Sequence, residues 1–144
     1  MILFLDTSAL VKLYVVEDGS EITQLAAKQA EILAASRIAW AEYHAAVAQR
    51  SRMVPADDPA LEKARNALAA DWGDFLVLEV SQRVVELAGE YAELYALRAY
   101  DAVQLATASY LARESGHSVQ FGCFDRRLNK AATAQGMEII QVAL

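Results

Sequence analysis

The chain has 144 residues, of which 56% are hydrophobic and only 2 are Pro and 6 are Gly, a composition that argues against disorder and fits one folded domain over residues 1–144. Its single cysteine, Cys123, excludes an internal disulfide and a cysteine-rich zinc site. No signal-peptide pattern opens the chain and no apolar run approaches the roughly 20 residues that span a membrane, so we expect a cytoplasmic protein with no membrane association. The formal net charge of −6 argues against a nucleic-acid partner, unless the acids converge on a metal site that neutralises them.

The first half of the chain alternates short apolar runs with amphipathic stretches. The run from Ile2 to Leu5 contains no polar residue, which is typical of a strand buried in a parallel sheet. Asp6 follows this run directly, and Ser20 is a predicted N-cap for a later helix. In chain order, the predicted elements are a strand over 2–5, a helix from 7, a helix over 21–30, a weaker strand over 32–35 and a helix over 38–53.

The second half continues the alternation. Asp58 is a predicted N-cap with Pro59 at the first helical position, and Ser81 is predicted to cap the helix after it. In chain order, the predicted elements are a helix to about 72, a strand over 75–80, a helix to about 97, a helix over 100–114, a strand over 119–124, a helix to 134 and a strand over 138–142. Strands that alternate with helices from end to end predict an α/β sandwich with a mostly parallel sheet.

Four acidic residues stand at comparable places in this pattern. Asp6 and Asp125 follow predicted strands, whereas Glu42 and Asp101 lie near the starts of predicted helices. The carboxyl edge of a parallel sheet is where α/β proteins bind ligands, and we expect all four side chains to converge there. Two unit charges about 4 Å apart cost roughly 4 kcal/mol at an effective dielectric of 20, so such a cluster requires protons or cations.

Carboxylate oxygens alone suit Mg²⁺ or Mn²⁺ and not zinc. A Mg²⁺ ion held by few carboxylates keeps bound waters, and one of these can lose a proton and attack a phosphodiester. Simpler roles are open for every acid. Asp6 and Asp125 can cap the helices that follow them, Asp101 can pair with Arg98, and Glu42 can be a solvated helix residue.

Taken together, the four acidic motifs resemble those of the PIN-domain family, and within it the VapC-like toxins of bacterial toxin–antitoxin pairs. The matching stretches are Phe-Leu-Asp-Thr-Ser-Ala-Leu-Val-Lys-Leu-Tyr around Asp6, Ala-Trp-Ala-Glu-Tyr around Glu42, Leu-Arg-Ala-Tyr-Asp-Ala-Val-Gln-Leu-Ala-Thr-Ala around Asp101 and Phe-Asp-Arg-Arg-Leu-Asn-Lys-Ala-Ala around Asp125. The order and spacing of these stretches carry the resemblance over nearly the whole chain.

The resemblance implies a PIN-like three-layer sandwich and a Mg²⁺-dependent endoribonuclease, with Mn²⁺ as a substitute. It implies that the catalytic and metal-binding set is Asp6, Glu42, Asp101 and Asp125, and that the Ser8 hydroxyl supports this set through a hydrogen bond. Its partners would be an RNA substrate, a cognate antitoxin and a second copy of the same chain.

Two other functions fit the same residues. A non-catalytic PIN-like binding module would use the acidic pocket to hold an RNA-bound metal or an arginine of a partner. A phosphatase would work through an aspartyl phosphate on Asp6, although such enzymes usually place a second Asp two residues on, where this chain has Ser8. The identity of the RNA and the number of metal ions stay open.

Two further sets of residues suggest binding surfaces. Arg126 and Arg127 directly follow Asp125 and can hold RNA phosphates, although ordinary solvated charge at a helix end is the simpler explanation for each. An apolar groove for an antitoxin helix can form from four side chains that are also compatible with the core: Leu13, Tyr14, Trp40 and Tyr43.

Overall fold

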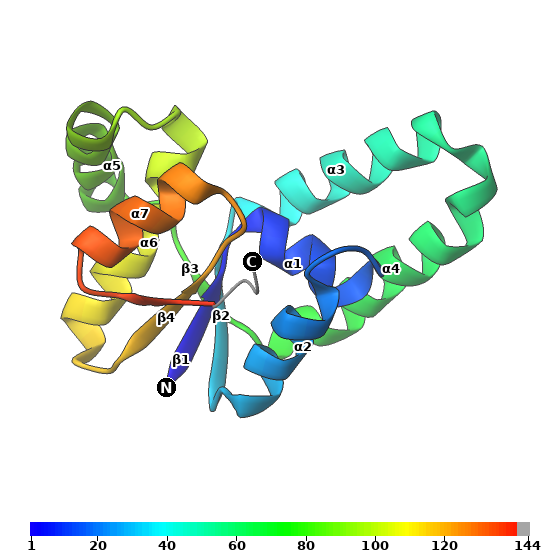
Figure 1. Cartoon of the computed structure of the whole chain (residues 1–144), viewed down its shortest axis with the longest axis horizontal. Helices are drawn as coiled ribbons and strands as arrows, with labels where there is room; N and C mark the ends of the chain where they lie inside the picture. The colour runs from blue at the N-terminus through cyan, green and yellow to red at the C-terminus, as the bar shows by residue number, and fades with distance from the viewer. Residues whose placement is uncertain (141–144) are drawn as a thin grey trace.

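A computed structural model describes residues 1–140 as an α/β sandwich with one central sheet (Figure 1). The sheet has five strands in the order β3-β2-β1-β4-β5, and every pair of neighbouring strands is parallel. The prediction of a mostly parallel sheet is thus confirmed. The strands are β1 (Ile2–Leu5), β2 (Ile32–Ser36), β3 (Leu76–Leu78), β4 (Val119–Gly122) and β5 (Glu138–Ile139).

Helices cover both faces of the sheet because the central strand is apolar on both sides. Along β1, Ile2 and Phe4 pack into one core, while Leu3 and Leu5 pack into the other. The first core is closed by α5 (Gln82–Tyr95), α6 (Ala99–Ser115) and α7 (Arg126–Ala134). The second is closed by α1 (Thr7–Tyr14), α2 (Ser20–Gln29), α3 (Ala39–Met53) and α4 (Asp58–Asp71).

The helices α3 and α4 form a hairpin that extends away from the sheet, at the right of Figure 1. Its turn is the short 3₁₀ helix η1 (Pro55–Asp57), and a second 3₁₀ helix, η2 (Trp72–Asp74), leads from α4 into β3. In the part of the chain that the structure describes, no helix has the length and apolarity needed to cross a membrane.

Two predicted helix caps are wrong. Ser20 is the first residue of α2, and its hydroxyl instead accepts from the Glu17 amide and donates to the Val15 carbonyl. Asp58 is already inside α4, where its carboxylate accepts a hydrogen bond from Ser51 on α3. In both cases another contact takes the side chain that was predicted to cap the helix, within the loop before α2 for Ser20 and between α3 and α4 for Asp58. The predicted Ser81 cap is confirmed, because its hydroxyl accepts from the Val84 amide at 3.3 Å.

The strands at the sheet edges are shorter than predicted. β3 covers Leu76–Leu78, within the predicted 75–80, and β5 covers only Glu138–Ile139. The predicted end of the last strand, at 141 and 142, lies outside the described residues. The two edge strands each pair with one neighbour only, which limits the length over which a ladder can form.

Candidate active site at the carboxyl edge of the sheet

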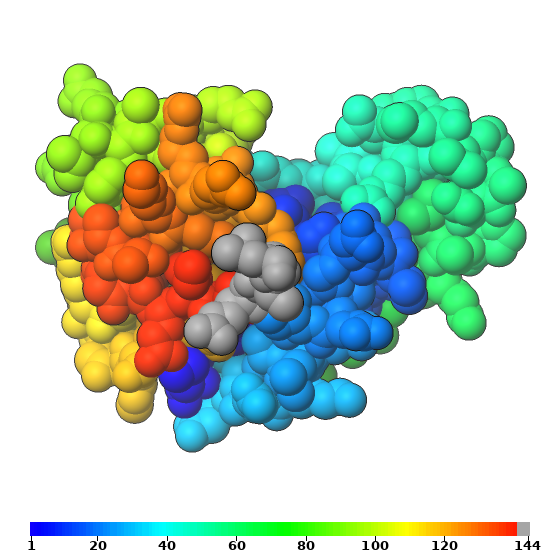
Figure 2. Space-filling view, viewed as in Figure 1, coloured from blue at the N-terminus to red at the C-terminus, as the bar shows by residue number. Residues whose placement is uncertain are grey.

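The sheet order places a switch point between β1 and β4. From β1 the chain turns to β2 on one side, while β4 pairs with β1 on the other side, so a crevice opens at their carboxyl ends. Figure 2 shows a hollow between the α3–α4 hairpin and the opposite half of the molecule. A pocket of about 330 Å³ lies at this edge, and its walls are Asp6, Thr7, Ser8, Glu42, Arg98, Asp101, Gln104, Phe124 and Asp125.

Asp6 forms the floor of this pocket and is also the N-cap of α1. Its Oδ1 accepts from the Ala9 amide at 3.0 Å and from the Ser8 hydroxyl at 2.7 Å. The side chain is only 6% exposed. Burial raises the pKa of Asp6 most strongly, the two hydrogen bonds oppose this shift, and the negative charge of Asp101 adds to it.

Asp125 reaches the same pocket from the loop after β4. Its Oδ1 accepts from the Leu128 amide at 2.9 Å and caps α7. Its own amide donates to the Cys123 sulfur at 3.2 Å, which fixes the turn between strand and helix. The structure gives its second oxygen, Oδ2, no hydrogen bond from the described residues, so this oxygen is available to a ligand.

Asp101 lies in the first turn of α6, a helix whose middle is buried in the core. Ala102, which follows Asp101 directly, is among the buried residues. Burial raises the pKa of Asp101, the charge of Asp125 raises it further, and Arg98 opposes both. The predicted Arg98–Asp101 pair exists, but at 3.8 Å it is a loose contact by a largely exposed arginine.

Glu42 is held by two residues that the sequence reasoning did not single out, Thr7 and Gln104. Glu42 Oε1 accepts from the Thr7 hydroxyl at 2.9 Å and from Gln104 Nε2 at 2.9 Å. The available signal for Gln104 was its spacing, because a residue three positions after Asp101 shares its helix face. For Thr7 the sequence offered a weaker indication, namely a hydroxyl group directly after Asp6.

Repulsion among the four acids is partly offset by the backbone around them. Asp6 and Asp125 are the N-caps of α1 and α7, and Glu42 and Asp101 lie in the first turns of α3 and α6. Four helix N-termini therefore point at one pocket, and their partial positive charges favour anionic groups there. In the described part of the chain, no three His, Cys, Asp or Glu side chains are grouped to coordinate one ion directly.

Of the two predicted RNA-binding arginines, one lies beside the pocket. Arg127 lines an adjoining cavity of about 330 Å³ that shares Arg98, Asp101 and Asp125 with the acidic pocket. One of its terminal nitrogens donates to the Ala96 carbonyl at 3.1 Å. Arg126 lines neither cavity. The two cavities together run from an acidic end to a basic end.

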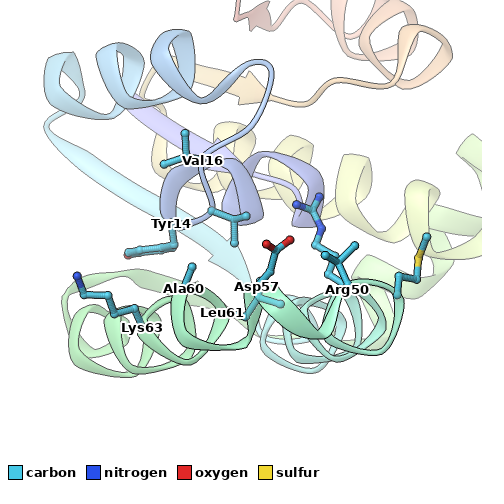
Figure 3. Close-up of a pocket in the computed structure, with 10 residues that line it drawn as sticks. Tyr14, Val16, Arg50, Asp57, Ala60, Leu61 and Lys63 are labelled. Atoms are coloured by element: carbon cyan, nitrogen blue, oxygen red, sulfur yellow. The ribbon is translucent and has the colours of Figure 1, made fainter.

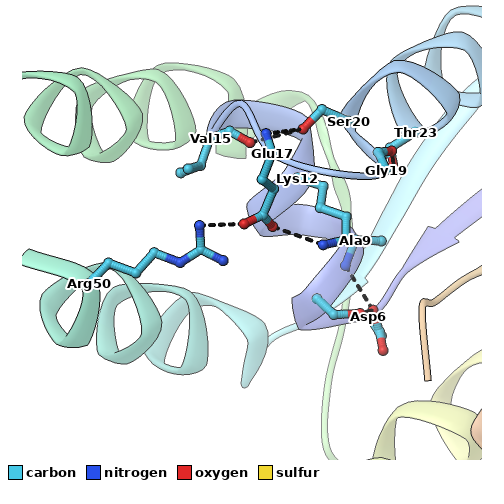
Figure 4. A network of polar contacts seen from close by, with 10 residues as sticks. Asp6, Ala9, Lys12, Val15, Glu17, Gly19, Ser20, Thr23 and Arg50 are labelled. Carbon is cyan, nitrogen blue, oxygen red and sulfur yellow. Dashed lines mark hydrogen bonds and ion pairs between the residues drawn. The ribbon is translucent and has the colours of Figure 1, made fainter. Parts of the chain in front are cut away.

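A charged network borders the site on the side of α1 and α3 (Figure 4). Glu17 pairs with Lys12 at 2.9 Å and with Arg50. Burial opposes ionisation of Glu17, but the hydrogen bonds from Arg50 and Lys12 outweigh it and lower its pKa. Lys12 also lies 4.9 Å from the ring centre of Phe124, which lines the acidic pocket. The network thus joins the loop after α1 to α3, the helix that carries Glu42.

The predicted four-residue apolar groove does not form. Tyr43 is completely buried and donates to the Ala64 carbonyl at 2.8 Å, whereas Trp40 is 36% exposed and packs on Trp72. Tyr14 instead lines a separate cavity of about 530 Å³ between the end of α1 and the α3–α4 hairpin (Figure 3). The exposed apolar side chains of this cavity, here called the hairpin pocket, are Val16, Met53 and Val54.

Similar proteins match the chain over most of its length. The PIN domain family model matches residues 3–134. Ribonuclease VapC45 from Mycobacterium tuberculosis is 32% identical over 147 residues, which cover 99% of this chain and 97% of the relative. Among solved structures, a toxin-antitoxin complex from Klebsiella pneumoniae matches with a TM-score of 0.58 and 19% identity, over 82% of this chain and 83% of that one. FitAcB from Neisseria gonorrhoeae matches with a TM-score of 0.59 and 20% identity, over 98% and 97%.

The sheet order and the pocket at its switch point define an α/β protein with four acidic residues lining a pocket at the carboxyl edge of its sheet. The chain belongs to the PIN domain family, and within that family it groups with the VapC ribonucleases. The resemblance and the three-layer fold expected from the sequence are thereby confirmed.

Proposed function

We propose that the protein is a metal-dependent endoribonuclease and the toxin of a toxin–antitoxin pair, acting as a single domain over residues 1–144. The observation that carries the proposal is the convergence of Asp6, Glu42, Asp101 and Asp125 on one pocket at the sheet switch point. The ribonuclease name of the relative with 32% identity supports the reaction. Because cellular RNA is the proposed substrate, we place the activity in the cytoplasm.

The residues of the pocket fit Mg²⁺ or Mn²⁺. All four acids offer oxygen ligands, and both Glu42 and Asp125 keep one carboxylate oxygen without a hydrogen bond from the described residues. Mg²⁺ binds through one or two carboxylates and keeps several waters, so it needs no cage of three direct ligands. The four acids would therefore hold a hydrated Mg²⁺ or Mn²⁺ ion without three direct protein ligands.

In this proposal the four acids would hold the metal, which when bound would supply an activated water and offset negative charge on the phosphate. Asp6 is fixed by the Ser8 hydroxyl and the Ala9 amide, so its carboxylate is oriented before any ligand arrives. Asp101 and Asp125 stand at the junction of the acidic and basic cavities, where they can orient the water in line with the scissile bond. Arg127 and Arg98 hold a neighbouring phosphate of the RNA.

Cleavage of cellular RNA tests the proposed reaction. Purified protein without antitoxin should cut total RNA at discrete positions in Mg²⁺ or Mn²⁺ and should leave it intact in chelator. If the protein binds RNA in Mg²⁺ yet cuts none, this result would contradict the proposed ribonuclease activity and favour a non-catalytic binding module.

For the antitoxin, we propose the hairpin pocket as the contact surface. Val16 is 91% exposed and stands with Met53 on the rim of a mostly apolar cavity, which fits the apolar side of an amphipathic segment. Changing Val16→Asp should weaken antitoxin binding at least tenfold while RNA cleavage continues. Val85→Asp is the matched control, because Val85 is exposed on α5, outside this pocket. An equal loss of antitoxin affinity in both variants would contradict the hairpin pocket as the contact surface.

The homodimer expected from the resemblance is also a proposal. Light scattering of the purified protein should give twice the mass of one chain. A single-chain mass at micromolar concentration would contradict it.

A further inference from the structure

Gln104 is a buried polar residue to which the proposed reaction gives no task. It is 3% exposed, lies on α6 one turn after Asp101, and lines the acidic pocket. We propose that Gln104 is a positioning residue, whose amide nitrogen fixes the Glu42 carboxylate so that its other oxygen stays available to the metal. This inference rests on the proposed metal-dependent function.

The contacts around Glu42 form a closed triangle. Gln104 Nε2 donates to Glu42 Oε1 at 2.9 Å and to Thr7 Oγ1 at 3.3 Å, and the Thr7 hydroxyl donates to the same Glu42 oxygen at 2.9 Å. Both amide hydrogens and the hydroxyl hydrogen are thus used. Two donors converge on one oxygen of the carboxylate, so the direction of the whole group is set by α1 and α6 and not by α3 alone.

The chemistry of the partners sets the orientation of the Gln104 amide. Glu42 presents only acceptors when ionised, and a reversed amide would place its carbonyl oxygen against the carboxylate. The NH₂ group therefore faces Glu42. This orientation leaves Gln104 Oε1 buried without a hydrogen-bond partner among the described residues, and a buried acceptor of this kind lowers stability.

A glutamine that serves the fold alone looks different in this same molecule. Gln135 Oε1 accepts from the Tyr91 hydroxyl at 3.0 Å, and its Nε2 donates to the Tyr95 hydroxyl at 2.7 Å. Both ends of Gln135 are satisfied, whereas one end of Gln104 is not. The cost of the orphaned oxygen is consistent with a residue retained for the site and not for stability.

The position of Gln104 also links two of the acids through one helix. Asp101 and Gln104 are three residues apart on α6, so the helix that carries one acid into the pocket also orients another. A carboxylate whose direction is fixed before the metal arrives binds it with less loss of conformational freedom. Gln104 therefore acts on metal affinity through Glu42.

The test compares the Mn²⁺ dissociation constant, measured by calorimetry, with the melting temperature in chelator. Gln104→Leu removes both amide hydrogens and the orphaned oxygen. We expect it to raise the Mn²⁺ dissociation constant about tenfold or more while the melting temperature stays the same or rises. Gln135→Leu is the matched control and should lower the melting temperature while Mn²⁺ affinity is unchanged.

A double-mutant cycle tests whether the effect passes through Glu42. In a Glu42→Gln background, Gln104→Leu should cause no further loss of Mn²⁺ affinity. If the two substitutions raise the Mn²⁺ dissociation constant independently, so that their fold-changes multiply in the double variant, the inference is overturned. A Gln104→Leu protein that melts at a lower temperature but binds Mn²⁺ like the wild type would also overturn it. Wild-type protein that binds no Mn²⁺ would overturn the proposed function and the inference together, whereas normal binding by the variant would overturn the inference alone.

Discussion

At the scale of single residues, two acids of the pocket that we propose as metal ligands also cap helices. One oxygen of Asp6 caps α1 and one oxygen of Asp125 caps α7, so capping and ligand binding are not exclusive roles. Asn caps a helix about as well as Asp. Asp→Asn substitutions at these positions therefore remove the charge and keep the cap, which separates the chemistry from the fold.

The pH dependence of stability should reveal the buried charge of Asp6. Because its pKa is raised above the ordinary 3.8, the native state binds this proton more tightly than the unfolded state. In chelator, the unfolding free energy of the wild type should fall relative to that of Asp6→Asn as pH rises from about 4 through the raised pKa. Denaturant unfolding at several pH values measures this, and a difference that is constant from pH 4 to 8 would contradict it.

The basic end of the cavity should contribute to RNA binding through one arginine and not its neighbour. Arg127→Ala should weaken binding of a short RNA and reduce the salt dependence of its affinity by about one phosphate contact, because this side chain lines the cavity beside Asp125. Arg126→Ala is the control and should have little effect. RNA affinity measured at several salt concentrations tests this prediction. If the logarithm of the affinity falls with the logarithm of the salt concentration at the same slope in both variants, the assignment of Arg127 is contradicted.

The sequence predicted the four acids because each lies at a strand end or a helix start and because the four motifs together resemble those of one family. It did not predict Gln104, since the spacing that places Gln104 on the helix face of Asp101 does not reveal which residue the amide contacts. That partner, Glu42, is 62 positions away. The predicted apolar groove failed for the same reason, because the burial of Tyr43 depends on α4, where its hydroxyl donates to the Ala64 carbonyl.

At the scale of the elements, the loop before α2 supports the wall of the pocket. Gly19 has a positive φ of 92°, and a Cβ at this position would lie 2.7 Å from Phe124 Cε1 and 3.0 Å from Lys12 Cδ. Phe124 directly precedes Asp125 and lines the acidic pocket. Close approach of two loops therefore depends on the absence of a side chain at Gly19.

Gly19→Ala should destabilise the protein by about 1–3 kcal/mol, because it adds backbone strain and a contact with Phe124. Gly89→Ala offers the opposite case, since Gly89 lies inside α5 with open space around a new Cβ. It should stabilise the protein by about 0.5–1 kcal/mol. Denaturant unfolding of both variants measures these changes, and a Gly19→Ala protein as stable as the wild type would contradict the account.

The helices and strands could be predicted from the sequence, but the residues at which several of them begin or end could not. The apolar run of β1 and the Ser81 cap are local features, and both predictions are confirmed. Neither Ser20 nor Asp58 caps its helix, because the loop before α2 takes the Ser20 hydroxyl and Ser51 on α3 takes the Asp58 carboxylate. A cap predicted from sequence assumes that no such partner exists.

At the scale of the whole molecule, the pocket exists because β1 and β4 are neighbours. Leu5 pairs with Gly122, and the Asp6 amide continues the ladder by donating to the Gly122 carbonyl at 2.9 Å. The sequence predicted a parallel sheet but not the order of its strands. Strand order depends on which apolar faces pack together, and that information is spread over the entire chain.

Metal binding should stabilise the whole fold, because it relieves repulsion that the metal-free protein retains. At 100 times the dissociation constant, Mg²⁺ should raise the unfolding free energy by about 2.7 kcal/mol. Asp101→Asn should reduce this gain and raise the stability of the metal-free protein, since the Asp101 charge repels Asp125 and Asp6. Thermal melts with and without Mg²⁺ measure both effects, and an unchanged melting curve at saturating Mg²⁺ would contradict a preformed site.

The most direct test of the proposed activity compares wild-type protein with Asp6→Asn on total cellular RNA, in Mg²⁺ and in chelator. The two proteins should share the same fold, because Asn keeps the α1 cap. The wild type should give discrete cuts that require the metal, and Asp6→Asn should lower the cleavage rate by about 10²-fold or more. Cuts of equal rate from both proteins would contradict a reaction centred on this pocket.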